Sequence, residues 1–253
     1  MNRLRRRGRT WISRSTQRAR KLATILITPD YRDGLRHGVA AATEHHRAPH
    51  IREPRTVLDI GANRGQFALV ARHRFPDAAL LCFEPLPEPR ERLERTVGGN
   101  GHVRVFPYAL GDRSGSTLFR VSTEDDSSSL LPTTEAQRAM FPGSATAYEI
   151  DIEIRRLDDL IEPTSLARPI LVKIDVQGTE LDVLRGSGAL RDVVDDLLIE
   201  CSFIELYEGQ PLVGEVIAFL SEWGMQVGGV HNVVSTPDGR CAQADLHFTR
   251  ASP

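Results

Sequence analysis

The sequence has few cysteines and no long hydrophobic run, and both absences limit what the protein can be. Its three cysteines, Cys82, Cys201 and Cys241, are widely spaced and form no C-x-x-C or Cys/His pairing. We therefore predict neither a zinc site nor a disulfide framework, and expect a reduced, cytoplasmic protein. The longest apolar run near the N-terminus, residues 22–27, is interrupted by a threonine and is shorter than a signal-peptide core or a membrane span.

The chain also lacks a large net charge, since the formal value is -2 over 253 residues, and this argues against a general nucleic-acid binder. The two ends nevertheless differ, because residues 1–21 contain nine Lys or Arg and no acid. Subtracting those nine from the 32 Lys and Arg leaves 23 against 34 acidic residues, a net charge of -11. We expect a basic N-terminal extension over residues 1–50 and one folded domain over residues 51–253. The extension is either a solvated basic segment or, through residues 1–27, a peripheral contact to an anionic membrane.

From residue 56 onward, short apolar runs alternate with longer amphipathic segments, which is typical of βαβ units around a mostly parallel sheet with helices on both faces. The pattern predicts seven strands, at residues 56–60, 79–84, 103–109, 170–175, 196–200, 225–230 and 246–249. It predicts helices at residues 66–74, 85–97, 180–185 and 211–223. Residues 112–157 break the alternation and predict an insertion after the third strand that shapes a substrate pocket.

A glycine-containing turn follows the first predicted strand, with Asp59, Gly61 and Gly65 in the spacing D-x-G-x-x-x-G. Gly61 would let the backbone approach a ligand, and Gly65 would let the next helix start close to the sheet. Asp59 would orient the turn or accept a hydrogen bond from an ammonium group of the ligand. Asn63 stands where the dehydrogenase pattern G-x-G-x-x-G has a glycine, so a pyrophosphate-binding dehydrogenase is the less favoured interpretation.

Two further acids follow predicted strands. Glu84 ends the second strand 25 residues after Asp59, near the distance at which an acid binds ribose hydroxyls. Asp112 follows the third strand, where it would read an adenine edge, or would serve the Gly-Asp turn by bonding its own backbone. Together with the glycine turn, these acids predict a site for a nucleoside cofactor.

Four motifs and two shorter segments carry a resemblance to a known family. The motifs are the turn from Val57 to Phe67, Phe83-Glu84-Pro85, Ala109-Leu110-Gly111-Asp112 and, most specific, Val172-Lys173-Ile174-Asp175-Val176-Gln177-Gly178-Thr179-Glu180. Leu184-Arg185-Gly186 and Ala244-Asp245-Leu246-His247-Phe248 are the two segments that also fit. With these motifs the chain resembles the FkbM family of methyltransferases from about residue 56 to residue 250. The resemblance implies a Rossmann-like class I methyltransferase fold, S-adenosylmethionine as the cofactor, and O-methylation of a sugar, a glycolipid or a polyketide. The acceptor would then be a small molecule or a lipid-linked glycan. Gln177 departs from the family pattern, which usually has an acid there.

Strand-end carboxylates are the candidates for catalysis, because ligands of open α/β sheets bind beyond the carboxyl ends of the strands where the strand order reverses. Asp175 is predicted to neighbour Asp59 there and to hold an acceptor hydroxyl as its general base. Glu200 is the second carboxylate, and the two together could instead hold Mg²⁺ that binds the acceptor oxygen. Lys173 shares the strand face of Asp175 and would pair with an acid or serve as a structural cation.

Other candidates have simpler interpretations. His231 has a suitable pKa for a base but precedes a turn-forming asparagine, Ser127–Ser129 resembles a flexible loop, and Tyr207 would line the pocket wall or pack in the core. A second hypothesis for the whole chain is a catalytically idle binding module that keeps the fold and uses its basic extension to reach a membrane or a partner. Cofactor binding separates the two hypotheses.

Overall fold

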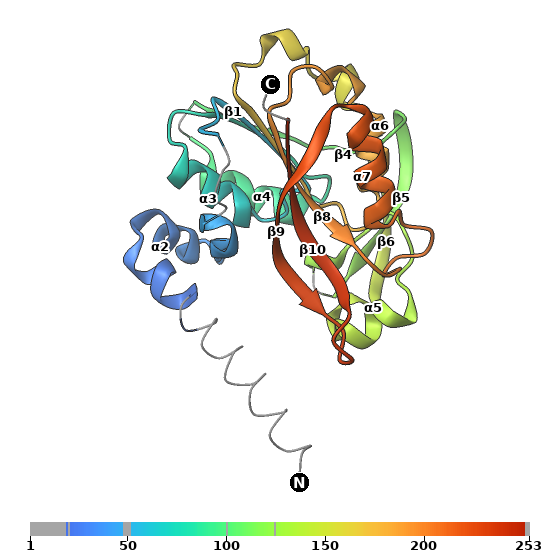
Figure 1. Cartoon of the computed structure of the whole chain (residues 1–253). Coiled ribbons are helices and arrows are strands. Elements are labelled where there is room, and N and C mark those ends of the chain that lie inside the picture. The colour runs from blue at the N-terminus through green and yellow to red at the C-terminus, as the bar shows by residue number, and fades with distance from the viewer. Residues whose placement is uncertain (1–18, 20, 48–51, 100, 124, 251–253) are drawn as a thin grey trace.

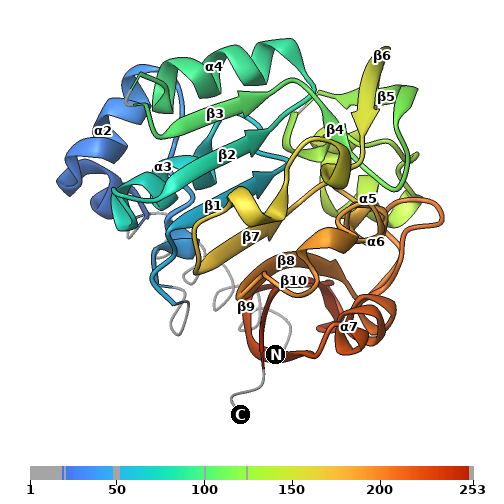
Figure 2. The same ribbon diagram turned by 90° about the horizontal axis from the view of Figure 1, so that it is seen from above.

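The computed structural model describes residues 19, 21–47, 52–99, 101–123 and 125–250, so residues 1–18, 20 and 48–50 of the predicted basic extension lie outside the described residues. A seven-stranded sheet runs through the molecule in the order β3-β2-β1-β7-β8-β10-β9. Figure 2 shows the strands side by side in this order. Their bounds are Val103–Phe106, Ala79–Phe83, Thr56–Ile60, Ile170–Ile174, Asp196–Ser202, Cys241–Arg250 and Met225–Ser235, respectively.

The first five strands of that order are parallel to one another, and only β10 is antiparallel to its neighbours, β8 and β9. All five residues of β1 and all five of β7 are buried. Parallel strands covered on both faces have continuous apolar sequences, and this is why both strands can be recognised in the sequence. The predicted Rossmann-like, mostly parallel seven-stranded sheet is confirmed.

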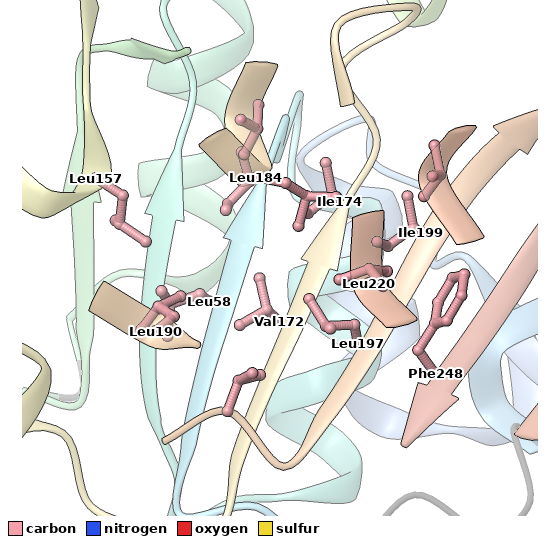
Figure 3. Close-up of a cluster of buried hydrophobic side chains, with 14 of the residues drawn as sticks. Leu58, Leu157, Val172, Ile174, Leu184, Leu190, Leu197, Ile199, Leu220 and Phe248 are labelled. Atoms are coloured by element: carbon pink, nitrogen blue, oxygen red, sulfur yellow. The ribbon is translucent and has the colours of Figure 1, made fainter. Parts of the chain in front are cut away.

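Helices cover both faces of the sheet (Figure 1). Helices α2 (Pro29–Arg36), α3 (Gln66–Arg74) and α4 (Pro87–Val97) pack on one face, together with the preceding helical residues 21–27. Helices α6 (Glu180–Arg185) and α7 (Val213–Glu222) pack on the other. Figure 3 shows Leu184 of α6 and Leu220 of α7 lying over strand residues such as Val172. No helix in the described part of the chain is long and apolar enough to cross a membrane.

The predicted insertion forms a small second sheet, with the order β4-β6-β5. Its strands are β4 (Ala109–Leu110), β5 (Gly115–Ser122) and β6 (Thr146–Arg155), and the helix α5 (Glu135–Met140) lies between β5 and β6. Short 3-10 helices complete the chain: η1 (Thr43–Arg47), η2 (Asp125–Ser127), η3 (Pro142–Ser144), η4 (Leu157–Asp159), η5 (Pro163–Ser165) and η6 (Gly188–Leu190).

The structure corrects the predicted bounds of three strands. The third strand, predicted to reach residue 109, ends at Phe106, because Pro107 has no N–H to donate to the ladder and the chain then leaves for the second sheet. The two closing strands, β9 and β10, are longer than predicted and reach Ser235 and Arg250. The prediction ended β9 at residue 230 because the following Asn232 is a turn-forming residue, whereas the strand continues through Asn232, which has φ of 50° beside a shift in the register with β10.

Candidate functional site

A cavity of about 270 Å³ opens at the carboxyl ends of β1, β2 and β7. The chain runs outward from β1 to β2 and β3, and then returns to place β7 on the other side of β1. The cavity therefore lies at the predicted reversal of strand order. Its wall comes from the turn after β1 (Gly61, Ala62, Asn63), the end of β2 (Phe83, Glu84), β7 and its loop (Lys173, Asp175, Gln177), the N-terminal segment (Lys21, Glu44, His45) and the insertion (Phe119, Ser128, Leu130).

Gly61 lines the cavity and has a left-handed backbone with φ of 78°. A Cβ at this position would lie 1.9 Å from the backbone oxygen of Asp175, so the close approach of β1 and β7 excludes any side chain. Gly65 does not line the cavity. A Cβ on it would lie 2.8 Å from Cδ1 of Leu93, so this glycine lets α3 approach α4. The prediction had been that Gly65 lets the helix start close to the sheet.

Glu84 ties the turn after β1 to the end of β2. Its Oε2 accepts the backbone N–H of Asn63 at 2.9 Å, and its Oε1 accepts that of Leu86 at 2.8 Å. Burial raises the pKa of Glu84 to about 7, although both backbone N–H groups and Arg90 oppose the rise. The carboxylate lines the cavity, and each oxygen keeps a lone pair for a ligand hydroxyl.

Asp59 is 0% exposed and is not among the residues that line the cavity. Neither of its carboxylate oxygens has a hydrogen-bond partner within the described residues. Burial raises the pKa of Asp59 to about 6, and Asp175 adds to the rise while Lys173 opposes it. Lys173 is its partner in the register of β1 and β7. Asp59 thus acts on the cavity through the charge of Lys173 rather than from the cavity wall.

Asp175 lies in the wall and already accepts two hydrogen bonds. Lys173 Nζ donates to Oδ2 at 3.0 Å, and Gln177 Nε2 donates to Oδ1 at 2.6 Å. Burial would raise the pKa of Asp175, but Lys173 and Gln177 outweigh it and lower the pKa below its usual value. The carboxylate can therefore accept a further hydrogen bond from a hydroxyl, but it is a weak proton acceptor.

Glu200 lies behind Gln177, whose Nε2 also donates to Glu200 Oε2 at 2.8 Å, and it is not among the cavity-lining residues. Burial and the nearby carboxylates of Asp175 and Asp245 raise the pKa of Glu200 well above its usual value. The predicted pair of carboxylates is thus brought together, with an amide between them.

This arrangement does not fit the predicted Mg²⁺ site. A metal ion needs lone pairs, whereas the Gln177 nitrogen that bridges Asp175 and Glu200 presents N–H donors, and the Lys173 ammonium occupies the other oxygen of Asp175. Across residues 21–47, 52–99, 101–123 and 125–250, no group of three or more His, Cys, Asp or Glu side chains could hold a metal ion.

Gln177 also joins β7 to the insertion, a role that its sequence did not reveal. Its backbone has φ of 57°, its Oε1 accepts the hydroxyl of Tyr207 at 2.7 Å, and its backbone oxygen accepts the hydroxyl of Ser129 at 2.6 Å. Gln137 donates to the same Tyr207 hydroxyl at 3.0 Å. Tyr207 is therefore a buried part of this network rather than a wall residue, and of the predicted serines Ser128 lines the cavity.

His45, which no sequence motif indicated, lines the cavity from η1. Its Nδ1 lies 3.8 Å from Oδ2 of Asp245 on β10, and its ring meets the ring of Phe67 edge-on at 5.4 Å. The described residues before position 48 thus pack on the domain instead of extending from it, with Ile25 and Tyr31 in the core. The apolar residues from Val39 to Ala42 were the available signal for this packing.

Two sequence candidates lie outside the cavity wall. Asp112 follows β4, and its backbone oxygen accepts a hydrogen bond from Arg156 Nη1 at 2.8 Å, which ties this turn to the segment after β6. His231 lies on β9, opposite Asp245 in the register with β10. Neither residue is carried into the proposed site.

Known proteins resemble this chain over most of its length. The model of the methyltransferase FkbM domain matches residues 59–227. The 2-O-methyltransferase NoeI of Sinorhizobium fredii is 30% identical over 189 residues, which cover 72% of this chain and 78% of that protein. The 31-O-demethyl-FK506 methyltransferase FkbM of Streptomyces tacrolimicus is 28% identical over 240 residues, which cover 86% of this chain and 84% of that protein.

A solved structure shows the same fold. The crystal structure of a methyltransferase FkbM from Methylobacillus flagellatus KT superposes with a TM-score of 0.53 at 17% sequence identity. The match covers 87% of this chain and 50% of that one, so the chain spans half the length of the solved protein.

Proposed function

Because the chain belongs to the FkbM family of methyltransferases, we propose that it transfers a methyl group from S-adenosylmethionine to a hydroxyl of a sugar, glycolipid or polyketide-type acceptor. The observation that carries the proposal is the cavity at the reversal of strand order, whose wall combines the Gly61 turn with the carboxylates of Glu84 and Asp175. Oxygen as the acceptor atom is supported by the names of two relatives, a 2-O-methyltransferase and a 31-O-demethyl-FK506 methyltransferase.

The residues around the cavity fit S-adenosylmethionine, which supplies an electrophilic methyl group on a cationic sulfur. Glu84 would accept the ribose hydroxyls, and the backbone from Gly61 to Asn63 would lie against the nucleoside. The carboxylates of Asp59 and Asp175 lie near a single ammonium group, that of Lys173, and the excess of negative charge favours a cationic ligand.

Asp175 would hold the acceptor hydroxyl, because it lies in the cavity wall and remains ionised. Glu200 would act through Gln177 as a positioning residue, since it accepts the second N–H of the amide that fixes Asp175. Holding the hydroxyl against the methyl group removes most of the entropy cost of the encounter.

The proposal is tested by calorimetric titration of the purified chain with S-adenosylhomocysteine, followed by transfer of labelled methyl groups to a panel of glycosides and polyketide alcohols. We expect binding, transfer to oxygen, and a loss of turnover in Asp175→Asn that far exceeds its loss of cofactor affinity. Absence of binding would remove the enzyme hypothesis, and binding without transfer to any acceptor would favour the idle binding module.

We also propose that residues 1–27 contact an anionic membrane surface. The helical residues 21–27 expose three apolar side chains, Leu22, Leu26 and Ile27, by 54%, 51% and 79%. They follow the basic residues 1–21, and Lys21 lines the cavity, so a lipid-linked acceptor would meet the cavity at the same surface. Co-sedimentation with phosphatidylglycerol vesicles, but not with phosphatidylcholine vesicles, is the expected result. Equal recovery in the supernatant with both lipids would contradict this proposal.

A further inference from the structure

We propose that His45 is the general base that accepts the proton of the acceptor hydroxyl, and that Asp245 orients and stabilises its ring. The inference rests on the proposed methyl transfer to a hydroxyl. Both residues lie outside the range 59–227 that the family model matches, and they come from opposite ends of the chain. They meet because η1 packs against α3, which brings His45 close to Asp245 on β10.

The placement of His45 suits a base. Its side chain is 10% exposed and lines the cavity, as does Asp175. Nδ1 lies 3.8 Å from Asp245 Oδ2, which leaves Nε2 as the nitrogen available to a ligand. Asp245 is itself fixed, because Asn232 Nδ2 donates to the same Oδ2 at 2.6 Å. The pair resembles the orienting carboxylate and histidine of many acid–base sites, whose contacts tighten when substrate binds.

The backbone around His45 is held in place. Its N–H donates to the backbone oxygen of Ala42 at 3.0 Å, and its own backbone oxygen accepts Arg74 Nη1 at 3.0 Å. The N–H of Ala42 donates to the backbone oxygen of Gln66 at 2.9 Å, at the start of α3. The ring of Phe67 then limits its rotation. These contacts fix the imidazole relative to the turn that binds the cofactor.

The protonation states favour His45 over Asp175 as the base. Burial lowers the pKa of His45, as does Lys173, while Asp245, Glu44 and Asp175 oppose the change. The ring is therefore neutral near pH 7 and can take a proton, whereas the ionised Asp175 is a weaker proton acceptor because its pKa is lowered. Asp175 holds the hydroxyl, and His45 removes its proton.

The transfer balances without a further reagent. The acceptor oxygen forms its bond to the methyl carbon while the carbon–sulfur bond breaks and leaves its electron pair on sulfur. The hydroxyl proton moves to Nε2 of His45. The positive charge that leaves the sulfur thus appears on the imidazolium, next to the carboxylate of Asp245, and bulk solvent later removes the proton.

The test compares kcat against pH for the full-length chain, His45→Gln and Asp245→Asn, with His37→Gln on the exposed end of α2 as the matched control. We expect His45→Gln to lower kcat about 100-fold or more with S-adenosylhomocysteine affinity within about twofold of wild type. Asp245→Asn should move the acid limb of the profile to lower pH, because it removes a carboxylate that raises the pKa of His45. The control should match the wild type.

Nuclear magnetic resonance titration of the histidine rings supplies a readout that needs no acceptor. The His45 signal should titrate below its usual pKa in the wild type and lower still in Asp245→Asn, even if His45→Gln folds poorly. A kcat of His45→Gln within fivefold of wild type, or a His45 pKa that Asp245→Asn leaves unchanged, would overturn the inference. Failure of the wild-type chain to bind S-adenosylhomocysteine would instead refute the proposed function, so the two failures are distinguishable.

Discussion

The stability of an Asp59→Asn variant relative to wild type should rise with pH. Asp59 is fully buried with no hydrogen-bond partner for either oxygen in the described part of the chain, and its pKa is raised from 3.8 to about 6. A folded-state pKa above the unfolded one means that the carboxyl stabilises the fold below pH 3.8 and that this contribution is lost as the pH rises through 6. A shift of about two pKa units corresponds to about 3 kcal/mol.

The asparagine side chain does not titrate, so it removes this pH dependence. From the two pKa values, the stability of Asp59→Asn relative to wild type should rise by about 1.4 kcal/mol between pH 5 and pH 8. Burying an amide without partners adds a cost of about 1–3 kcal/mol, which is the same at every pH and does not alter the slope. The same substitution should weaken binding of S-adenosylmethionine, because it removes one of the carboxylates near the cavity.

The assay is urea unfolding of both proteins at pH 5, 6, 7 and 8, with Asp195→Asn as the control. Burial would raise the pKa of Asp195, but Arg168 and the backbone N–H of Ile170 outweigh it and lower the pKa. Because the folded-state pKa of Asp195 lies below the unfolded one, its ionised carboxyl stabilises the fold above the unfolded pKa, and this contribution is lost only as the pH falls further. Asp195→Asn should therefore be less stable than wild type by a constant amount from pH 5 to pH 8. A wild-type to Asp59→Asn difference that stays flat from pH 5 to 8 would refute the reasoning.

Three further substitutions test the site and its support. Gly61→Ala should abolish S-adenosylhomocysteine binding and lower the melting temperature more than the control Gly239→Ala. Both glycines have positive φ, but only at Gly61 would a Cβ lie against backbone atoms. Calorimetric titration and thermal melts measure the two effects. Glu84→Gln should weaken the same binding, and wild-type affinity should fall as the pH drops through about 7, because protonation of Glu84 impairs the group proposed to accept the ribose hydroxyls. Titrations at pH 6 and 8 check the sign. Asp196→Ala should cost about 1–3 kcal/mol in urea unfolding, because the Nε2 atom of the buried His247 loses its hydrogen-bond partner, the carboxylate that lies 2.7 Å away.

Much of the fold follows from local sequence, as particular elements show. The predicted bounds of β1, α3 and α6 match the structure, because buried parallel strands are continuously apolar and glycine or proline marks the ends of the neighbouring helices. The prediction was wrong where that signal fails. The third strand was carried past Pro107, and β9 was ended at residue 230 although it continues through the turn-forming Asn232 to Ser235.

The residues of the site also differ in whether the sequence reveals them. Gly61, Glu84 and Asp175 belong to short motifs at strand ends, so the sequence reveals them. His45 and Asp245 are 200 residues apart, and only the packing of η1 against the sheet brings them together. The Mg²⁺ hypothesis failed for a similar reason, since no local pattern shows that the amide of Gln177 bridges both proposed ligands.

The buried acids around the cavity lower the stability of the folded chain. Burial raises the pKa of Asp59 to about 6 and those of Glu84 and Glu180 to about 7, so each carboxylate is less stable in the folded chain than in water. A core made only for stability would replace them with apolar residues, as in the rest of β1 and β2. Their common position at the carboxyl end of the sheet concentrates negative charge where a cationic cofactor is proposed to bind. A ligand with positive charge would relieve the desolvation of several acids at once, so its binding would stabilise the fold by more than its direct hydrogen bonds alone provide.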